Sequence, residues 1–327
     1  MISQFWLKEP LSLHNKTIWI AGHNGMVGRA LHRTLANEGC RIITASRNEL
    51  DLRDQAATHQ WVKINKPEMI IIAAAKVGGI LANDAFKCDF LYDNTMIAMN
   101  ILHAAYENGV KHVLNLGSSC IYPKDAAQPI TEDQLLSSTL EPTNEAYALA
   151  KIIGLKLAKY YSEAHNMRYI SAMPCNLYGI GDSYHVQNSH VIPALIMKAH
   201  EAKLGQSPAL EIWGSGKPLR EFLYVDDLAR ALVFLLKNYA EPDHINVGSG
   251  IEISIADLAE LICEIVGYKG KLVFDTSKPD GTYRKVMDSS ALKNKNWAPK
   301  TDLNTGLNLA YEDYLKNHYK GEEQRSA

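Results

Sequence analysis

Residues Thr17–Gly28, TIWIAGHNGMVG, decide the fold of this chain of 327 residues. The first five are apolar or β-branched, as expected of a buried strand, and Gly22, Gly25 and Gly28 follow at once. Helical periodicity then runs from Met26 to Glu38. Glycine is needed where the backbone turns tightly or approaches a pyrophosphate, and the helix N-terminus offers N–H groups to phosphate. The stretch predicts a nucleotide-binding turn; the alternative is a glycine-rich structural turn.

Strand and helix patterns alternate along the rest of the chain. Apolar runs typical of a parallel sheet covered on both faces occupy 17–21, 41–45, 69–74, 112–116, 169–173 and 244–248. Helical periodicity covers 26–38, 55–65, 91–108, 145–165, 191–203, 227–236, 254–267 and 305–317. Asp226 or Asp227 is expected to cap one of these helices, and Ser254 with Asp257 to form a capping box for the next. This alternation predicts an α/β fold.

We expect a Rossmann-type doubly wound parallel sheet with a smaller α/β substrate-binding domain. The Rossmann domain is predicted to be discontinuous, comprising residues 14–177 plus about 223–250. The smaller domain is predicted to comprise about 178–222 plus 251–320, because the strand–helix rhythm changes after Pro174.

Charge and hydropathy exclude several classes of protein. The 34 Lys and Arg side chains nearly balance the 36 Asp and Glu, so no basic surplus exists to neutralise a nucleic acid. The longest apolar runs, such as 69–75, fall well short of the roughly 18 residues of a membrane span, and Lys8, Glu9 and Pro10 interrupt any signal-peptide core. Five dispersed cysteines without a CxxC pair suit a reducing compartment and give no zinc pattern. We therefore expect a cytoplasmic enzyme with no nucleic-acid, membrane or metal partner.

The residues after the second predicted strand indicate which dinucleotide is bound. A typical NAD site places a carboxylate there for the ribose hydroxyls, but this strand ends in Thr44–Arg47, with no acid before Glu49. Arg47 is suited to pair with a 2′-phosphate, which favours NADPH; the alternative is a solvated loop arginine. Asp51 either meets the adenine edge or caps the next helix.

A tyrosine and a lysine share one helix face in Tyr147-Ala-Leu-Ala-Lys151. A four-residue step separates them by about 6 Å along the axis, and the ammonium is expected to lower the phenol pKa and prepare a general acid or base. Ser118 follows a strand at the carboxyl edge of the sheet, where it is able to bond a substrate carbonyl beside Tyr147. The alternative is an ordinary surface pair.

The glycine turn, the serine after a strand and the YxxxK pair, in this order, resemble the extended short-chain dehydrogenase/reductase superfamily. Longer motifs resemble its GDP-L-fucose synthase family, the GDP-4-keto-6-deoxy-D-mannose 3,5-epimerase/4-reductases, and the similarity covers the chain from Lys16 to the last helix. They are AAAKVGGI (73–80), LGSSCIYP (116–123), LEPTNEAYALAK (140–151), NLYG (176–179), NSHVIPAL (188–195), WGSGKPLREFLYVDD (213–227), HINVGSG (244–250) and KPDGT (278–282).

The resemblance implies two chemistries in one pocket. The 4-keto group acidifies the protons at C3 and C5, which are removed and returned on the opposite face, and NADPH then reduces C4. Cys120 and His190 match the acid/base pair of the family, and Ser118, Tyr147 and Lys151 match its reductase triad. A thiol and an imidazole transfer protons near neutral pH; otherwise Cys120 is a small buried hydrophobe and His190 a cap or packing residue.

The same resemblance implies the binding residues. For NADPH they are Gly22, His23, Asn24, Gly25, Met26, Val27, Gly28, Arg47, Asp51, Leu52, Ala74, Leu116, Gly117, Ser118, Ser119, Tyr147, Lys151, Pro174, Cys175, Asn176, Leu177 and His190. For the GDP-sugar substrate they are Lys198, Trp213, Arg220 and Asp280. The resemblance also implies a homodimer joined through the helices at 91–108 and 145–165.

Two positions depart from the family. Asn24 stands where some members carry an arginine that grips the 2′-phosphate, which leaves Arg47 as the clamp. Cys175 stands where the relatives carry threonine. Two other functions stay open: the same chemistry, or reduction alone, on a related GDP-keto-sugar such as a 6-deoxy-heptose, and a non-catalytic NADP-binding regulator.

Overall fold

The computed structural model describes residues 6–185, 189–278 and 280–319. Three stretches named above therefore lie partly outside the described residues: the motifs 188–195 and 278–282, and the predicted end of the smaller domain at residue 320.

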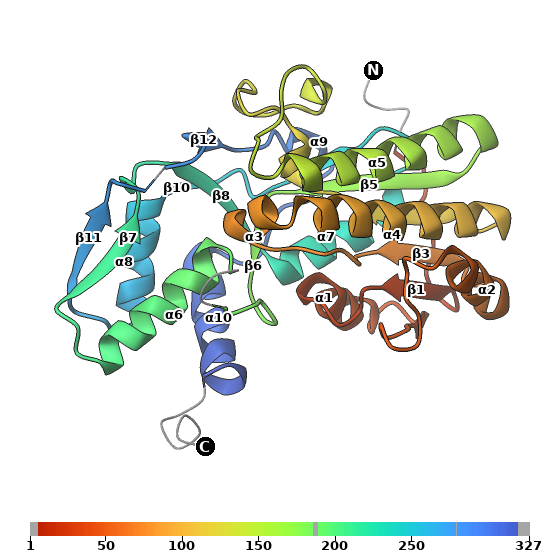
Figure 1. Ribbon diagram of the computed structural model, residues 1–327. Coiled ribbons are helices and arrows are strands. Elements are labelled where there is room, and N and C mark those ends of the chain that lie inside the picture. Colours follow the sequence, from red (N-terminus) through yellow and green to blue (C-terminus); the bar gives the residue numbers. More distant parts are fainter. Residues whose placement is uncertain (1–5, 186–188, 279, 320–327) are drawn as a thin grey trace.

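A six-stranded parallel sheet forms the larger part of the molecule (Figure 1). Its order is β2 (Arg41–Ile43), β1 (Thr17–Ala21), β3 (Met69–Ile72), β4 (His112–Leu116), β5 (Arg168–Pro174) and β9 (Ile245–Val247). Every neighbouring pair is parallel. All four residues of β3 are buried, which explains its unbroken apolar run.

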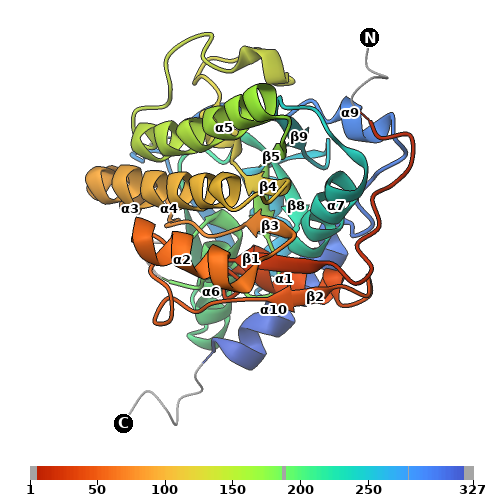
Figure 2. The same ribbon diagram turned by 90° about the vertical axis from the view of Figure 1, so that its right-hand side faces the viewer.

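Helices cover both faces of this sheet. Figure 2 shows α2 (Gln55–Asn65), α4 (Lys87–Glu107) and α5 (Glu145–His165) on one side, and α1 (Met26–Leu35) and α7 (Val225–Asn238) on the other. The short α3 (Ile80–Ala85) precedes α4, and α9 (Ser290–Lys293) lies near β9. The predicted doubly wound α/β fold is confirmed.

A second body contains its own hydrophobic core (left in Figure 1). This core joins Tyr178 and Phe222 to apolar residues of α6 (Val191–Leu204), α8 (Ile255–Val266) and α10 (Leu303–Asn317). In one sheet β8 (Leu219–Tyr224) pairs with β10 (Glu252–Ser254), β12 (Arg284–Lys285) and β6 (Asn176–Tyr178); in another β7 (Ala209–Trp213) pairs with β11 (Lys271–Asp275). The predicted residue boundaries between two domains stay a prediction.

Local signals account for several helix starts, with one exception. Ser254 accepts the Asp257 N–H and bonds its carboxylate, as the capping box predicts. Neither Asp226 nor Asp227 caps α7, because Asp227 is fully buried and accepts the backbone N–H groups of Lys300 and Thr301 instead. Within the described part of the chain, no helix has the length and apolar character needed to cross a bilayer.

Candidate functional site

The turn after β1 leaves no room for a side chain at Gly22 or Gly28. A Cβ on Gly22, which has φ +92°, would lie 2.5 Å from the Ala74 nitrogen, and one on Gly28 would lie 2.2 Å from the Gly22 oxygen. Gly25 is the N-cap residue of α1 and has no side chain to occupy the first N–H groups of the helix. The backbone therefore forms an open anion cradle at a helix N-terminus.

A cavity of about 310 Å³ adjoins this cradle. It is lined by eight of the predicted cofactor residues: Gly22, His23, Asn24, Gly25, Arg47, Asp51, Leu52 and Ala74. The buried Nδ1 atom of His23 has no partner among the described residues, as expected where a polar ligand completes the wall. The close glycine backbone, the orphaned nitrogen and the cationic Arg47 all fit a dinucleotide phosphate.

The predicted reductase residues meet at the carboxyl end of β4. Lys151 Nζ donates to the Leu116 carbonyl at 2.7 Å and lies 5.7 Å from the centre of the Tyr147 ring. Ser118 is hydrogen-bonded to the Tyr147 side chain, and its Oγ accepts the Cys120 N–H at 3.3 Å. The serine hydroxyl, the phenol and the ammonium therefore lie close to one another.

Burial dominates the titration of this group. It raises the pKa of Tyr147 well above its usual range, with Cys120 adding to the rise and the Ser118 hydrogen bond opposing it. Burial lowers the pKa of Lys151 to about 8, and Cys120 opposes that fall. The expected fall in the phenol pKa is wrong for this arrangement, because burial raises this pKa.

The Cys120 thiol belongs to the same cluster. It lies within electrostatic range of both Tyr147 and Lys151. Asn144, directly before α5, points its Nδ2 at the sulfur from 3.6 Å. Sequence reasoning did not single out Asn144, although it stands three residues before Tyr147 in a quoted motif.

His190 stands at the N-cap of α6. Its side chain is exposed, yet surrounding protein lowers its pKa by desolvation, a combination expected within a cleft. The hydroxyl of the preceding residue, Ser189, donates to the Ser183 carbonyl at 2.8 Å and so fastens this end of the helix. That His190 faces Cys120 across one sugar ring stays a prediction.

The four predicted substrate residues lie on the second body, where Lys198 contacts Trp213 and Asp280 lies within electrostatic range of Arg220. Lys198 Nζ lies 5.2 Å from the Trp213 ring centre, and Lys278, which sequence reasoning did not single out, lies 5.6 Å from the same ring. Burial lowers the pKa of Arg220, and Asp280 opposes that fall. Ser215, two residues after Trp213, donates both its backbone N–H and its hydroxyl to Asp280.

A two-strand connection links the sheet to the second body. The Cys175 N–H donates to Val247 at 3.0 Å in the main sheet, whereas Asn176 Nδ2 donates to the Glu221 carbonyl at 2.9 Å in the other. Burial raises the pKa of Cys175 far above its usual range, so this thiol is a packing group. Pro174–Leu177, predicted to line the nicotinamide, thus lie at the junction.

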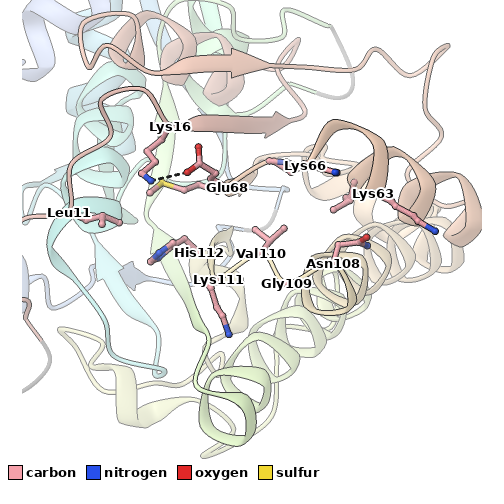
Figure 3. Close-up of a pocket in the computed structure, with 13 residues that line it drawn as sticks. Leu11, Lys16, Lys63, Lys66, Glu68, Asn108, Gly109, Val110, Lys111 and His112 are labelled. Atoms are coloured by element: carbon pink, nitrogen blue, oxygen red, sulfur yellow. Dashed lines mark hydrogen bonds and ion pairs between the residues drawn. The ribbon is translucent and has the colours of Figure 1, made fainter.

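A second cavity, of about 500 Å³, lies at the opposite edge of the sheet (Figure 3). Lys16 and Glu68 pair across it at 2.8 Å, and Figure 3 shows the amino groups of Lys63, Lys66 and Lys111 pointing away from one another. Lys63 and Lys66 stand at the C-terminal end of α2, where the helix dipole favours cations. Since parallel sheets bind ligands at the carboxyl edge, we assign no function to this cavity.

Comparison with known proteins gives a consistent result. Residues 18–248 match the NAD dependent epimerase/dehydratase family. A GDP-L-fucose synthase of Sinorhizobium fredii is 54% identical over 93% of this chain and 97% of its own length. A solved GDP-L-fucose synthetase from Naegleria fowleri bound to NADP is 31% identical, with a TM-score of 0.87 over 96% of this chain and 98% of that one.

A solved GDP-6-OMe-4-keto-L-xylo-heptose reductase from C. jejuni is also similar, at 33% identity and a TM-score of 0.87 over 93% of this chain and 99% of that one. The sequence match to the Sinorhizobium protein is much the stronger of the two. The chain belongs to the NAD-dependent epimerase/dehydratase family and, within it, to the GDP-L-fucose synthases.

Proposed function

We propose that the protein converts GDP-4-keto-6-deoxy-D-mannose to GDP-L-fucose. It epimerises C3 and C5 by acid/base proton exchange and then reduces the C4 keto group with NADPH. The observation that carries this proposal is the Cys120 thiol beside Tyr147 and Lys151, because a plain ketone reductase needs the latter two but has no use for a second acid/base group there.

One pair of hydrogen-bond donors serves both reactions. Ser118 and Tyr147 stand together at the end of β4, where they bond the C4 oxygen of the sugar. When a proton leaves C3 or C5, negative charge moves to that oxygen, and the two hydroxyls stabilise it. The same hydroxyls polarise the ketone for reduction, so the substrate keeps its position between the two steps.

Cys120 and His190 exchange the carbon-bound protons. One residue removes the proton from one face of the sugar carbon and the other donates a proton to the opposite face, which inverts the carbon. The first residue then releases its proton to solvent and the second takes one up, so that no net change in protonation remains. Desolvation keeps His190 neutral near pH 7, ready to accept a proton. Asn144 fixes the direction of the Cys120 sulfur through its Nδ2.

The reductive step uses the same residues in another role. Bound NADPH supplies the hydride that reduces C4. Because burial raises the pKa of Tyr147, its phenol stays protonated at neutral pH and is a ready proton donor to the C4 oxygen. Lys151 is largely an ammonium below about pH 8, where it stabilises the tyrosinate that remains.

The cofactor phosphates and the GDP moiety of the substrate bind to different bodies of the protein. The cradle at Gly22–Gly28 and the cationic Arg47 receive the phosphates of NADPH. Lys198, Arg220 and Asp280 address the GDP moiety, with the Trp213 indole available for stacking.

Proton exchange in heavy water without NADPH tests the epimerase step. The wild type should wash deuterium into C3 and C5, whereas Cys120→Ser should lose most of the exchange and still bind NADPH. Cys40→Ser is the matched control, because Cys40 bonds only the Leu35 carbonyl at the end of α1. Equal deuterium exchange in Cys120→Ser and in the control would show that Cys120 takes no part in proton exchange. Addition of NADPH to the wild type should then yield GDP-L-fucose with one NADPH consumed per sugar.

The alternative substrate is a GDP-keto-heptose, as the similarity to the C. jejuni heptose reductase suggests. The values of kcat/KM for the two sugars, measured side by side, decide between them, because specificity is the ratio of these constants. Reduction of either sugar with C3 and C5 unchanged would leave a plain 4-reductase.

We further propose a homodimer in the cytoplasm. Large apolar side chains are exposed on adjacent helices, Leu91, Tyr92 and Met99 on α4 and Ile153 and Tyr160 on α5, a pattern expected of a helix–helix contact between two copies. The five cysteines are all free, which suits a reducing compartment. Sedimentation of the wild type against Met99→Glu tests the dimer: the variant should sediment as a monomer.

A further inference from the structure

The cofactor cavity carries an acidic side chain, Asp51, which would oppose a 2′-phosphate placed near it. Asp51 lies on its wall together with Arg47 and Asn24. A carboxylate beside the adenosine ribose favours a free 2′-hydroxyl and repels a 2′-phosphate. Asn24 carries no positive charge that would offset this repulsion. Binding of the 2′-phosphate therefore requires another residue that reduces the effect of the carboxylate.

Arg53, on the same wall, engages this carboxylate from two sides. Its Nε lies 3.0 Å from Asp51 Oδ1 and its terminal nitrogen 2.7 Å from Oδ2, and its backbone N–H also donates to Oδ1 at 3.0 Å. The other terminal nitrogen donates to Asp93 on α4 at 3.2 Å. Such a fork holds both partners in one orientation.

Of the other two cationic side chains on the cavity wall, Lys76 is paired with carboxylates of the described residues and Arg47 is not. Lys76 bonds Asp89 at 2.8 Å and Asp93 at 3.3 Å. Arg47 forms no ion pair with any residue in the described ranges. Asp51 nevertheless lies within electrostatic range of Arg47, so a carboxylate released by Arg53 is free to turn to it.

We infer that Arg53 determines the preference for NADPH, as a positioning residue that holds Asp51 away from Arg47 and so keeps Arg47 available for the 2′-phosphate. Arg53 does not itself contact the phosphate in this scheme. The inference rests on the NADPH site of the proposed function, and it explains how a chain with Asn24 in its glycine turn retains that preference.

The test measures dissociation constants of NADPH and NADH by titration calorimetry, together with the salt dependence of each. Arg53→Gln should weaken NADPH binding about three- to tenfold and change NADH binding less than twofold, because only NADPH places its phosphate on Arg47. Adding Asp51→Asn to Arg53→Gln should restore NADPH binding to within about twofold of the wild type. Lys63→Gln is the control for net charge, since it lies on α2 at the opposite edge of the sheet.

The double variant separates the possible results. If it binds NADPH as weakly as Arg53→Gln, then Arg53 contacts the phosphate directly and the inference is wrong; an unchanged NADPH affinity in Arg53→Gln overturns it equally. If Arg53→Gln does not fold, Arg53→Lys decides: a lysine cannot hold both carboxylate oxygens of Asp51, so NADPH binding should weaken while NADH binding stays within about twofold, and an unchanged NADPH affinity contradicts the scheme. A wild type that binds neither dinucleotide would instead refute the proposed function.

Discussion

Replacing Lys151 by methionine should stabilise the protein at neutral pH while it abolishes reduction. Burial lowers the pKa of this lysine from its ordinary 10.5 to about 8, which corresponds to a cost of roughly 3 kcal/mol for keeping the ammonium charged. The hydrogen bond to the Leu116 carbonyl at 2.7 Å offsets about 2 kcal/mol of this cost. The variant should therefore gain about 1 kcal/mol at pH 7, a rise of one to two degrees in Tm for a chain of this length.

The gain should reverse at higher pH. Between pH 8 and 10.5 the folded lysine has lost its proton and the unfolded lysine has not, so the wild type becomes more stable as pH rises through this window. The increase amounts to about 2 kcal/mol between pH 7 and 9.5. Because the variant lacks this group, the two stability curves should cross.

Urea unfolding of both proteins at a series of pH values measures the difference directly. Lys63→Met on α2, an exposed site, serves as the control and should show a flat difference from the wild type. The turnover of Lys151→Met should fall at least about a hundredfold. A variant that is less stable than the wild type at pH 7, by an amount that does not change up to pH 9.5, would refute the argument that burial of the charge governs this site.

Three further changes test other parts of the structure. Tyr122→Phe removes a buried hydroxyl that donates to Asn246 Oδ1 at 2.5 Å; urea unfolding should show a loss of about 1–3 kcal/mol, and kcat should fall more than KM rises, since Cys120 lies two residues away. Trp6→Ala empties a site packed against Tyr239 at the N-terminus and should cost about 3–5 kcal/mol in the same measurement, with turnover per folded molecule unchanged. Burial raises the pKa of Asp182 to about 7, so the folded protein holds a proton between pH 4 and 7 that the unfolded chain releases, and stability falls as pH rises through that window. Asp182→Asn should flatten this fall and be more stable than the wild type above pH 7; a parallel pair of curves would contradict the assignment.

The parallel sheet was predictable because its strands are buried on both faces. Met69–Ile72 is an unbroken apolar run, His112–Leu116 is buried at four of its five positions, and the strand–glycine–helix order at Thr17–Gly28 fixes the first unit. The second body was harder to predict. Ala209–Trp213 alternates exposed and buried residues, but its partner, Lys271–Asp275, lies some sixty residues away, and neither was expected.

Site residues on one helix or one turn were predictable, and those defined by distant partners were not. Tyr147 and Lys151 follow from a four-residue spacing. Arg53 bonds Asp51, two residues before it, and also Asp93, forty residues along the chain, and no local pattern predicts the second contact. Asp227 was expected to cap a helix, but its partners, Lys300 and Thr301, come from a segment whose approach no local pattern reveals.

Helix α6 has a consequence for how such an enzyme changes its substrate. His190 stands at its start and Lys198 eight residues later, so a rigid rod of about 12 Å separates the proposed proton-exchange group from the proposed nucleotide contact. Any hexose or heptose that is attached to the same nucleotide is therefore held at the same distance from the proton-exchange group. A change of sugar specificity therefore requires mutations only in the loops that contact the sugar. The residues that bind the nucleotide can stay the same.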